Sequence, residues 1–134
     1  MKFPENIQVK ELNHAAYEDK LTGQYQVAQV LTDCRGPIDR IYQLNEPAKL
    51  VDSKWQRVIE IRALNTGQWV LWNPGKEIAS TMADVHRHGQ REFVCLEAAN
   101  TQWQVIEANE TLMIGQQISV ADLYSHSPLR CHET

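Results

Sequence analysis

The sequence predicts an all-β protein, an antiparallel β-sandwich, from three observations. Short apolar or alternating runs recur along the chain, as half-buried strands require. Glycine, proline and asparagine separate these runs at fairly even spacing. Only one short stretch is a good helix candidate. A chain of 134 residues is also long enough to bury a core, so 1–134 is expected to form a single domain.

The expected strands are short and are listed here in chain order: 7–12, 25–31, 38–42, 49–52, 57–62, 69–72, 93–96, 104–107 and 116–120. Alternation is clear in 57–62, whereas 69–72 is apolar throughout and predicts a buried strand. Asn73-Pro74-Gly75 ends that strand, because proline lacks an amide hydrogen and glycine permits a turn.

The helix candidate runs from Ser80 to His88. Ser80 or Thr81 can cap its start, Asp84 lies in its first turns, and Gly89 can end it. The polar tail 125–134 is expected to be loosely ordered.

Composition excludes several classes of partner. The net charge is −4 and there is no basic block, so nucleic acid is not expected. No apolar run approaches the roughly 20 residues that cross a bilayer, and the start of the chain lacks the apolar stretch of a signal peptide. Cys34, Cys95 and Cys131 are scattered and odd in number, which indicates reduced thiols and a cytoplasmic location.

Two carboxylates interrupt apolar surroundings. Asp39 lies within 38–42 beside Arg40, and period two places these two charges on opposite faces of the strand. Glu97 follows the apolar run 93–96, where a carboxylate is costly unless it is solvated, paired or functional. Such a group can serve as a general base. The alternative is that both carboxylates are simply exposed to water and have no function. Asp39 would then lie beside Arg40 on an edge strand, and Glu97 would lie at a strand end.

A third polar feature is the spacing His86-x-His88-x3-Glu92, which matches the first metal-binding motif of cupins. Two histidines at i and i+2 on a strand point the same way and can share a metal. The flanking glycines of that motif and a second histidine motif are absent. A solvated polar loop is therefore favoured over a cupin-like site, and neither a metal nor another cofactor is expected.

Five short motifs occur in an order that resembles the C-terminal half of the hexose-6-phosphate mutarotases, the glucose-6-phosphate 1-epimerases of the aldose 1-epimerase family: Tyr17-Glu-Asp-Lys, Ile38-Asp-Arg-Ile-Tyr42, Val70-Leu-Trp-Asn-Pro74, Met82-Ala-Asp84 and Phe93-Val-Cys-Leu-Glu97. The resemblance runs from about residue 7 to residue 120. It implies the galactose-mutarotase-like supersandwich, of which 1–134 would be the C-terminal part. It also implies an isomerase that interconverts the α and β anomers of a hexose 6-phosphate without a cofactor.

The resemblance also implies roles for the two carboxylates. Glu97 would be the base that takes the proton from the anomeric hydroxyl, and Asp39 would hold sugar hydroxyls. The acid histidine and the phosphate-binding arginines of the family lie upstream of the Tyr17 motif, and His14 does not match that histidine's surroundings. We therefore expect little activity from this chain alone.

Half of a sandwich exposes sheet edges and apolar faces. We therefore expect either self-association into a homo-oligomer or pairing with a missing N-terminal half. A non-catalytic carbohydrate-binding or interaction module on the same scaffold is the main rival function.

Overall fold

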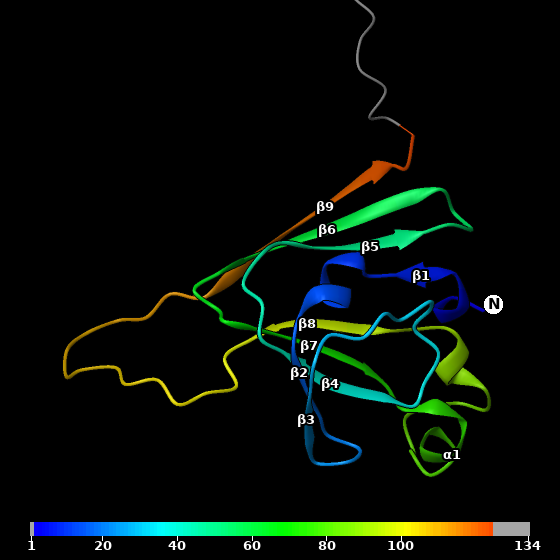
Figure 1. Ribbon diagram of the computed structural model, residues 1–134, viewed down its shortest axis with the longest axis horizontal. Helices are drawn as coiled ribbons and strands as arrows, with labels where there is room; N and C mark the ends of the chain where they lie inside the picture. The colour runs from blue at the N-terminus through cyan, green and yellow to red at the C-terminus, as the bar shows by residue number, and fades with distance from the viewer. Residues whose placement is uncertain (1, 125–134) are drawn as a thin grey trace, which may run out of the picture.

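The computed structural model describes residues 2–124, which form two antiparallel sheets packed face to face (Figure 1). Sheet A has the strand order β1-β5-β6-β9, with bounds Ile7–Gln8, Ala48–Asp52, Arg57–Leu64 and Gly115–Asp122. Sheet B has the order β3-β2-β4-β7-β8, with bounds Gln24–Gln26, Tyr17–Asp19, Ile38–Tyr42, Gln68–Asn73 and Cys95–Ala99. The predicted antiparallel β-sandwich is confirmed.

Helix is scarce in the described part of the chain. One short α-helix, α1, covers Gly75–Ala79, and three 3-10 turns cover Pro4–Asn6, Lys10–His14 and Gly89–Arg91. Within residues 2–124, no helix is both long and apolar enough to cross a membrane. The tail 125–134, which was expected to be loosely ordered, lies outside the described residues.

The core lies between the two sheets. Sheet B contributes Tyr42, Trp69 and Leu71, and sheet A contributes Ile7 and Ala48, all of them buried. Burial of large apolar side chains on both inner faces is the main stabilisation of such a sandwich. The indole of Trp69 also donates a hydrogen bond from Nε1 to the Glu46 carbonyl oxygen, 2.9 Å away, so its one polar atom is satisfied.

Asp52 is a fully buried carboxylate at the end of β5. Arg57 Nε donates to its Oδ2 over 2.9 Å, and the backbone amides of Lys54 and Trp55 donate to its Oδ1 over 3.2 and 3.1 Å. A buried charge is tolerated when it is paired and hydrogen-bonded in this way. Asp52 therefore closes the β5–β6 turn and is not a free functional group.

Five of the predicted strands form close to their expected bounds, and three differ in extent. Strands 38–42, 49–52, 57–62, 69–72 and 116–120 all form, each within two residues of the expected ends. The run 7–12 gives only two strand residues before a 3-10 turn, and 25–31 gives strand only through Gln26. The run 93–96 corresponds to β8, which begins at Cys95, so Glu97 stands in mid-strand and not at a strand tip.

The helix prediction for 80–88 was wrong, because the α-helix ends where that stretch begins. Ser80 Oγ donates to the Glu77 carbonyl oxygen over 2.6 Å, and Thr81 Oγ1 donates to the Ile78 carbonyl oxygen over 2.7 Å. Their hydroxyls thus bond backwards, to the last carbonyls of α1, and do not cap a new helix. The residues after them form turns.

The strand predicted at 104–107 was also wrong. Residues 100–114 form a long arm that joins β8 to β9 and projects beyond both sheets (Figure 1, yellow to orange). Residues 104–107 have no strand partner in the described structure, so their apolar pattern produces no ladder. Alternation predicts a strand only where another strand is available to pair with it.

Candidate active site

Sheet B has one face in the core and one face directed away from sheet A, here called the outer face. The register pairs Asp39 with Trp72 and Trp72 with Cys95. It also pairs Ile41 with Val70 and Val70 with Glu97. Directly paired residues share a face and alternate with the core residues along each strand. The outer face therefore carries both predicted site carboxylates, separated by an apolar strip.

Arg40 lies on the other face of β4, as the sequence predicts. Its guanidinium carbon stands 4.2 Å from the centre of the Tyr17 ring, and its nitrogens donate to Tyr42 Oη and Gln29 Oε1 over 3.3 and 3.1 Å. β4 is a central strand and not an edge strand, so the structural alternative of two solvated edge charges is wrong. Arg40 is held by aromatic and polar neighbours, whereas Asp39 lies on the outer face.

Glu97 is exposed at the centre of β8. Within residues 2–124 its carboxylate makes no hydrogen bond or ion pair. Burial raises the pKa of the Cys95 thiol, and the charge of Glu97, two residues along the same face, raises that pKa further. An accessible carboxylate with free lone pairs can accept a proton from a bound hydroxyl.

Asp39 is half-buried on the outer face. Burial raises the pKa of its carboxyl, Lys20 acts in the opposite direction, and Asp19 adds a smaller upward effect. The Lys20 amide donates to the Asp39 carbonyl oxygen over 2.8 Å, which fixes the end of β2 beside β4. Lys20 was not singled out by the sequence, because only the pairing of β2 with β4 brings it near Asp39.

An aromatic pair lies beside Asp39. Trp72, directly opposite Asp39, packs against Phe93 with ring centres 5.9 Å apart. Both rings are only partly buried. Small-molecule sites typically combine such apolar surface with a few polar groups that fix the orientation of the ligand. The sequence left open whether Trp72 is core or ligand platform, and the register places it on the outer face.

Asp39 and Glu97 share the outer face but are not direct neighbours. They lie two strands apart and are offset by two residues, which places their Cα atoms about 12 Å apart from standard sheet spacings. Two carboxylate side chains with a sugar ring between them span such a distance. That they line a common cleft remains a prediction.

Asn73 is a structural residue that sequence reasoning missed. Its side chain is buried at the end of β7 and makes three hydrogen bonds. Nδ2 donates to the carbonyl oxygens of Gln90 and Phe93 over 3.0 and 2.8 Å, and Oδ1 accepts from the Gly75 amide over 2.9 Å. Asn73 thereby ties the loop after β7 to the start of β8 and positions Phe93. The available signal was the Asn-Pro-Gly sequence itself, which we interpreted only as a turn.

Gly36 lies against the same turn. A Cβ atom added there would come within 2.6 Å of the side chain and backbone of Asn73 and of the Gly75 amide. Contacts of that length require the backbone to move, so only glycine fits at this position. The turn after β7 is therefore packed from both sides.

The histidine motif forms a local contact. His86 Nε2 lies 2.9 Å from Glu92 Oε2, while His88 has a left-handed backbone with φ of 63°. Within the part of the chain described, no group of three His, Cys, Asp or Glu side chains is placed to hold a metal ion. This arrangement adds nothing in favour of the cupin-like alternative.

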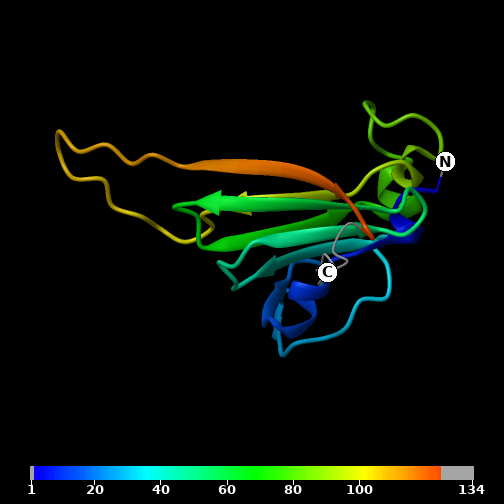
Figure 2. The same cartoon turned by 90° about the horizontal axis from the view of Figure 1, so that it is seen from above.

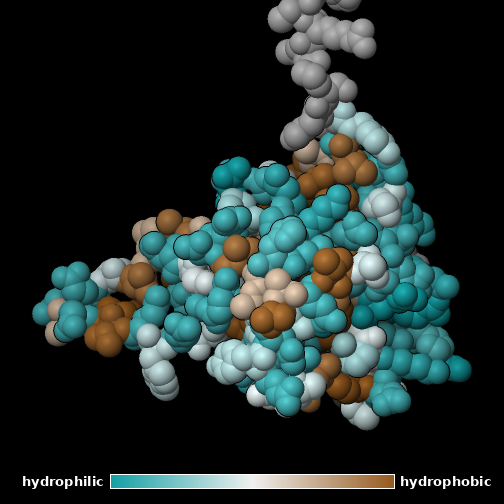
Figure 3. Space-filling model, viewed as in Figure 1, coloured by the Kyte–Doolittle hydropathy of each residue, from teal (hydrophilic) through white to brown (hydrophobic). Residues whose placement is uncertain are grey.

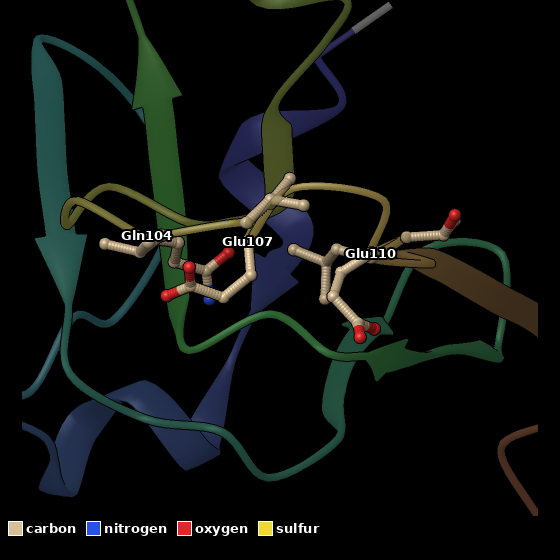
Figure 4. Close-up of a pocket in the computed structure, with 7 residues that line it drawn as sticks. Gln104, Glu107 and Glu110 are labelled. Carbon is tan, nitrogen blue, oxygen red and sulfur yellow. The ribbon is translucent and has the colours of Figure 1, made fainter.

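A surface hollow of about 370 Å³ lies within the arm (Figure 4). Its polar lining consists of Gln104, Glu107, Glu110 and Thr111. None of its lining residues belongs to sheet B. It is a space between the two legs of the arm and is separate from the carboxylates of the outer face.

The two-sheet fold is that of a mutarotase-like β-sandwich. Two solved structures share the fold. One is YeaD from Salmonella typhimurium, described as a candidate mutarotase, with a TM-score of 0.77 and 26% identity over 91% of this chain and 42% of that chain. The other is HI1317, with a TM-score of 0.71 and 19% identity over 90% of this chain and 43% of that chain.

This chain spans less than half the length of either solved structure. No protein-family profile matches the sequence. No curated protein sequence matches it either.

Proposed function

We propose that this chain forms the proton-accepting part of a mutarotase-type isomerase that acts on a hexose 6-phosphate such as glucose 6-phosphate. Glu97 is the general base and Asp39 binds sugar hydroxyls. The observation that carries the proposal is the placement of both carboxylates on one outer sheet face of a mutarotase-like sandwich, with Trp72 between them. The description of YeaD as a candidate mutarotase and the order of the sequence motifs support the same reading.

Mutarotation needs a base for one proton and an acid for another. The Glu97 carboxylate takes the proton of the anomeric hydroxyl as the bond between C1 and the ring oxygen breaks. The ring oxygen takes a proton from an acid, which leaves an open-chain aldehyde. Rotation about the bond between C1 and C2 presents the other face of the carbonyl. The hydroxyl that was the ring oxygen then attacks this other face of the carbonyl. It returns its proton to the acid, the new anomeric oxygen takes the proton back from Glu97, and the other anomer forms.

The described strands of sheet B carry no histidine, so a histidine acid would come from elsewhere. Among the described residues, His14 lies in a 3-10 turn beside sheet A, and His86 and His88 lie in the loop before β8. His86 is already in contact with Glu92. A chain with the base but without a suitably placed acid loses a contribution of about 10²–10⁴-fold in rate. This chain alone is therefore expected to show little activity.

The test is anomer exchange measured by NMR magnetisation transfer on glucose 6-phosphate, with glucose as the comparison sugar. The protein is a chimera in which this chain replaces the matched part of YeaD, so that the rest of that sandwich is present. We expect exchange faster than in buffer, and a fall of about 10²-fold or more with Glu97→Gln, since the amide keeps the shape and removes the proton acceptor.

Two controls sharpen this test. Glu46→Gln changes an exposed glutamate beyond the end of β4, away from the proposed site, and should leave the rate unchanged. Asp39→Asn should raise the sugar concentration needed for half-maximal rate. A folded chimera that exchanges anomers no faster than buffer contradicts the enzyme proposal, and sugar binding without exchange would favour the non-catalytic binding module.

A further inference from the structure

A second hollow lies between α1 and the loop that leads to β8. Figure 1 and Figure 2 both show α1 and this loop at one end of the molecule, with the arm at the other end. The hollow has a volume of about 410 Å³. Its lining includes two permanent cations, Lys76 on α1 and Arg87 on the loop, together with His86 and His88.

The two permanent cations at this hollow have no carboxylate partner. Among residues 2–124, neither Lys76 nor Arg87 makes an ion pair or a side-chain hydrogen bond. Six other cations each pair with a carboxylate: Lys2, Lys20, Arg35, Lys49, Arg57 and Arg62. Two free cations at one hollow create a local positive potential in a chain whose net charge is −4. Figure 3 shows a mainly hydrophilic surface at this end, on the right of the view.

The carboxylates of the same loop segment stay out of the lining. Glu77, Asp84 and Glu92 are not among the described residues that line the hollow. Glu92 instead holds His86, whose Nε2 lies 2.9 Å from Glu92 Oε2 and whose Nδ1 lies 3.0 Å from the Arg87 carbonyl oxygen. Both ring nitrogens of His86 are therefore engaged, and its ring forms part of the wall.

Four lining side chains keep their donors free for a ligand. They are Lys76, Arg87, His88 and Gln90, and within residues 2–124 none of these side chains makes a hydrogen bond. A guanidinium presents paired donors that match the oxygens of a phosphate, and an ammonium adds a point charge. The volume lies in the range of about 300–1,000 Å³ that is typical of small-molecule sites. It therefore has room for a phosphate group and part of the molecule that carries it.

The loop is held in one position against α1. Gly89 is buried, and a Cβ atom added there would lie 2.9 Å from Val85 Cγ1. The Gly89 amide donates to the His86 carbonyl oxygen over 2.8 Å, and Asn73 Nδ2 donates to the Gln90 carbonyl oxygen over 3.0 Å. A site whose backbone is already ordered loses less conformational entropy when it binds.

We propose that the hollow between α1 and residues 85–90 binds the phosphate group of a phosphorylated small molecule through Lys76, Arg87, His88 and Gln90. Lys76 approaches from the helix and Arg87 from the loop, so the phosphate is held between the two elements. The site is separate in residues from Asp39 and Glu97, and the proposal holds whether or not Glu97 is a base.

Inorganic phosphate, titrated into this chain at constant ionic strength and followed by amide NMR, tests the proposal. Saturable shifts should appear at residues 76–90. Lys76→Gln and Arg87→Gln should each raise the Kd about tenfold, because each removes a hydrogen bond to a charged group. Lys54→Gln is the matched control: Lys54 is also exposed and has no ion pair among the described residues, but it lies in the β5–β6 turn.

Glucose 6-phosphate provides a second arm that identifies the source of the phosphate. If the hollow holds the phosphate of the sugar proposed above, glucose 6-phosphate should bind more tightly than inorganic phosphate, and Asp39→Asn should remove that advantage. If the ligand is a different phosphorylated molecule, the two probes should bind equally and compete, and Asp39→Asn should have no effect. Either result supports the site.

Three results would overturn the proposal. The first is the absence of a saturable shift at residues 76–90. The second is a shift around Lys54 as large as that in the loop, which is general ion screening. The third is unchanged phosphate affinity in a folded protein that carries both Lys76→Gln and Arg87→Gln. Failure of the enzyme proposal is a different observation, namely a folded chimera without anomer exchange, and phosphate binding to this chain is measured without it.

Discussion

Ile61 and Ile118 are neighbours in sheet A, paired directly and pointing to the same face, yet they differ completely in burial. Ile61, on β6, packs into the core that Trp69 and Leu71 form from sheet B. Ile118, on β9, lies one strand further and is largely exposed. The same residue type in the same register is thus core or surface depending on what stands opposite. We call the flank of the sandwich that ends with the short strands β1 and β3 the closed side, and the flank that ends with β8, β9 and the arm the open side. Among residues 2–124, the core packing that covers Ile61 does not extend to Ile118 on the open side.

The two sides also differ in how their edges end. The closed side finishes with β1 and β3, which are too short to offer a long row of free backbone groups. The open side finishes with β9, which is eight residues long and stands last in the described strand order of sheet A. Exposed apolar side chains and a long edge strand occur together there.

The largest effect is expected from paired tryptophan substitutions on the two sides. Trp69→Ala should cost about 3–5 kcal/mol of the free energy of unfolding, because it empties the core and removes the bond to the Glu46 carbonyl. Trp103→Ala, on the open side, should stay within about 0.5 kcal/mol. Urea unfolding followed by circular dichroism measures both. Equal costs for the two would remove the distinction between the sides.

Asn73→Ala should cost about 1–3 kcal/mol, because the buried carbonyl and amide groups that it serves are left without partners. Asn45→Ala, at an exposed position, should be nearly neutral. Thermal unfolding gives the comparison, and hydrogen exchange of residues 75–93 should show the loop loosening. A variant as stable as its parent would contradict the role given to Asn73.

Cys34 and Cys95 should differ in how fast their thiols are alkylated. Burial raises the pKa of the Cys34 thiol to about 12, and it raises the pKa of Cys95, on β8, as well. In a Cys131→Ser background at pH 8, Cys34 should react with iodoacetamide at least about tenfold more slowly than Cys95, because its thiolate is scarce and its access is blocked. Mass spectrometry of the modified peptides measures this. Faster labelling of Cys34 would show that the core is open.

The smallest effect is expected on the pKa of His86, which contacts Glu92 at an exposed position. Glu92 raises the pKa of His86 through their hydrogen bond, with a smaller contribution from the Arg87 carbonyl. The contact is therefore fully stabilising below the unfolded pKa of histidine and is lost as the pH rises through the folded pKa. An NMR titration should show the His86 pKa falling toward its ordinary value in Glu92→Gln. Glu107→Gln, on the arm, should leave it unchanged.

The sequence predicted strands well where period-two alternation or an apolar run had a partner nearby, as in 38–42 and 57–62. It failed at 104–107, where the same pattern lies in the arm and pairs with nothing. It failed again at 80–88, because Ser80 and Thr81 can cap a helix start or bond back to the end of a preceding helix. Local sequence does not distinguish these cases, since the choice depends on what lies before the segment.

The site shows the same division between sequence and tertiary structure. Asp39 and Glu97 could be identified as unusual carboxylates from their apolar neighbours, and alternation alone separated Asp39 from Arg40. That Asp39 and Glu97 share a face depends on two registers, β4 with β7 and β7 with β8, and a slip of one residue in either would put the two carboxylates on opposite faces. The arrangement of strands also decided that Ile61 is core and Ile118 is surface. Burial is a property of facing layers, which single strands do not encode.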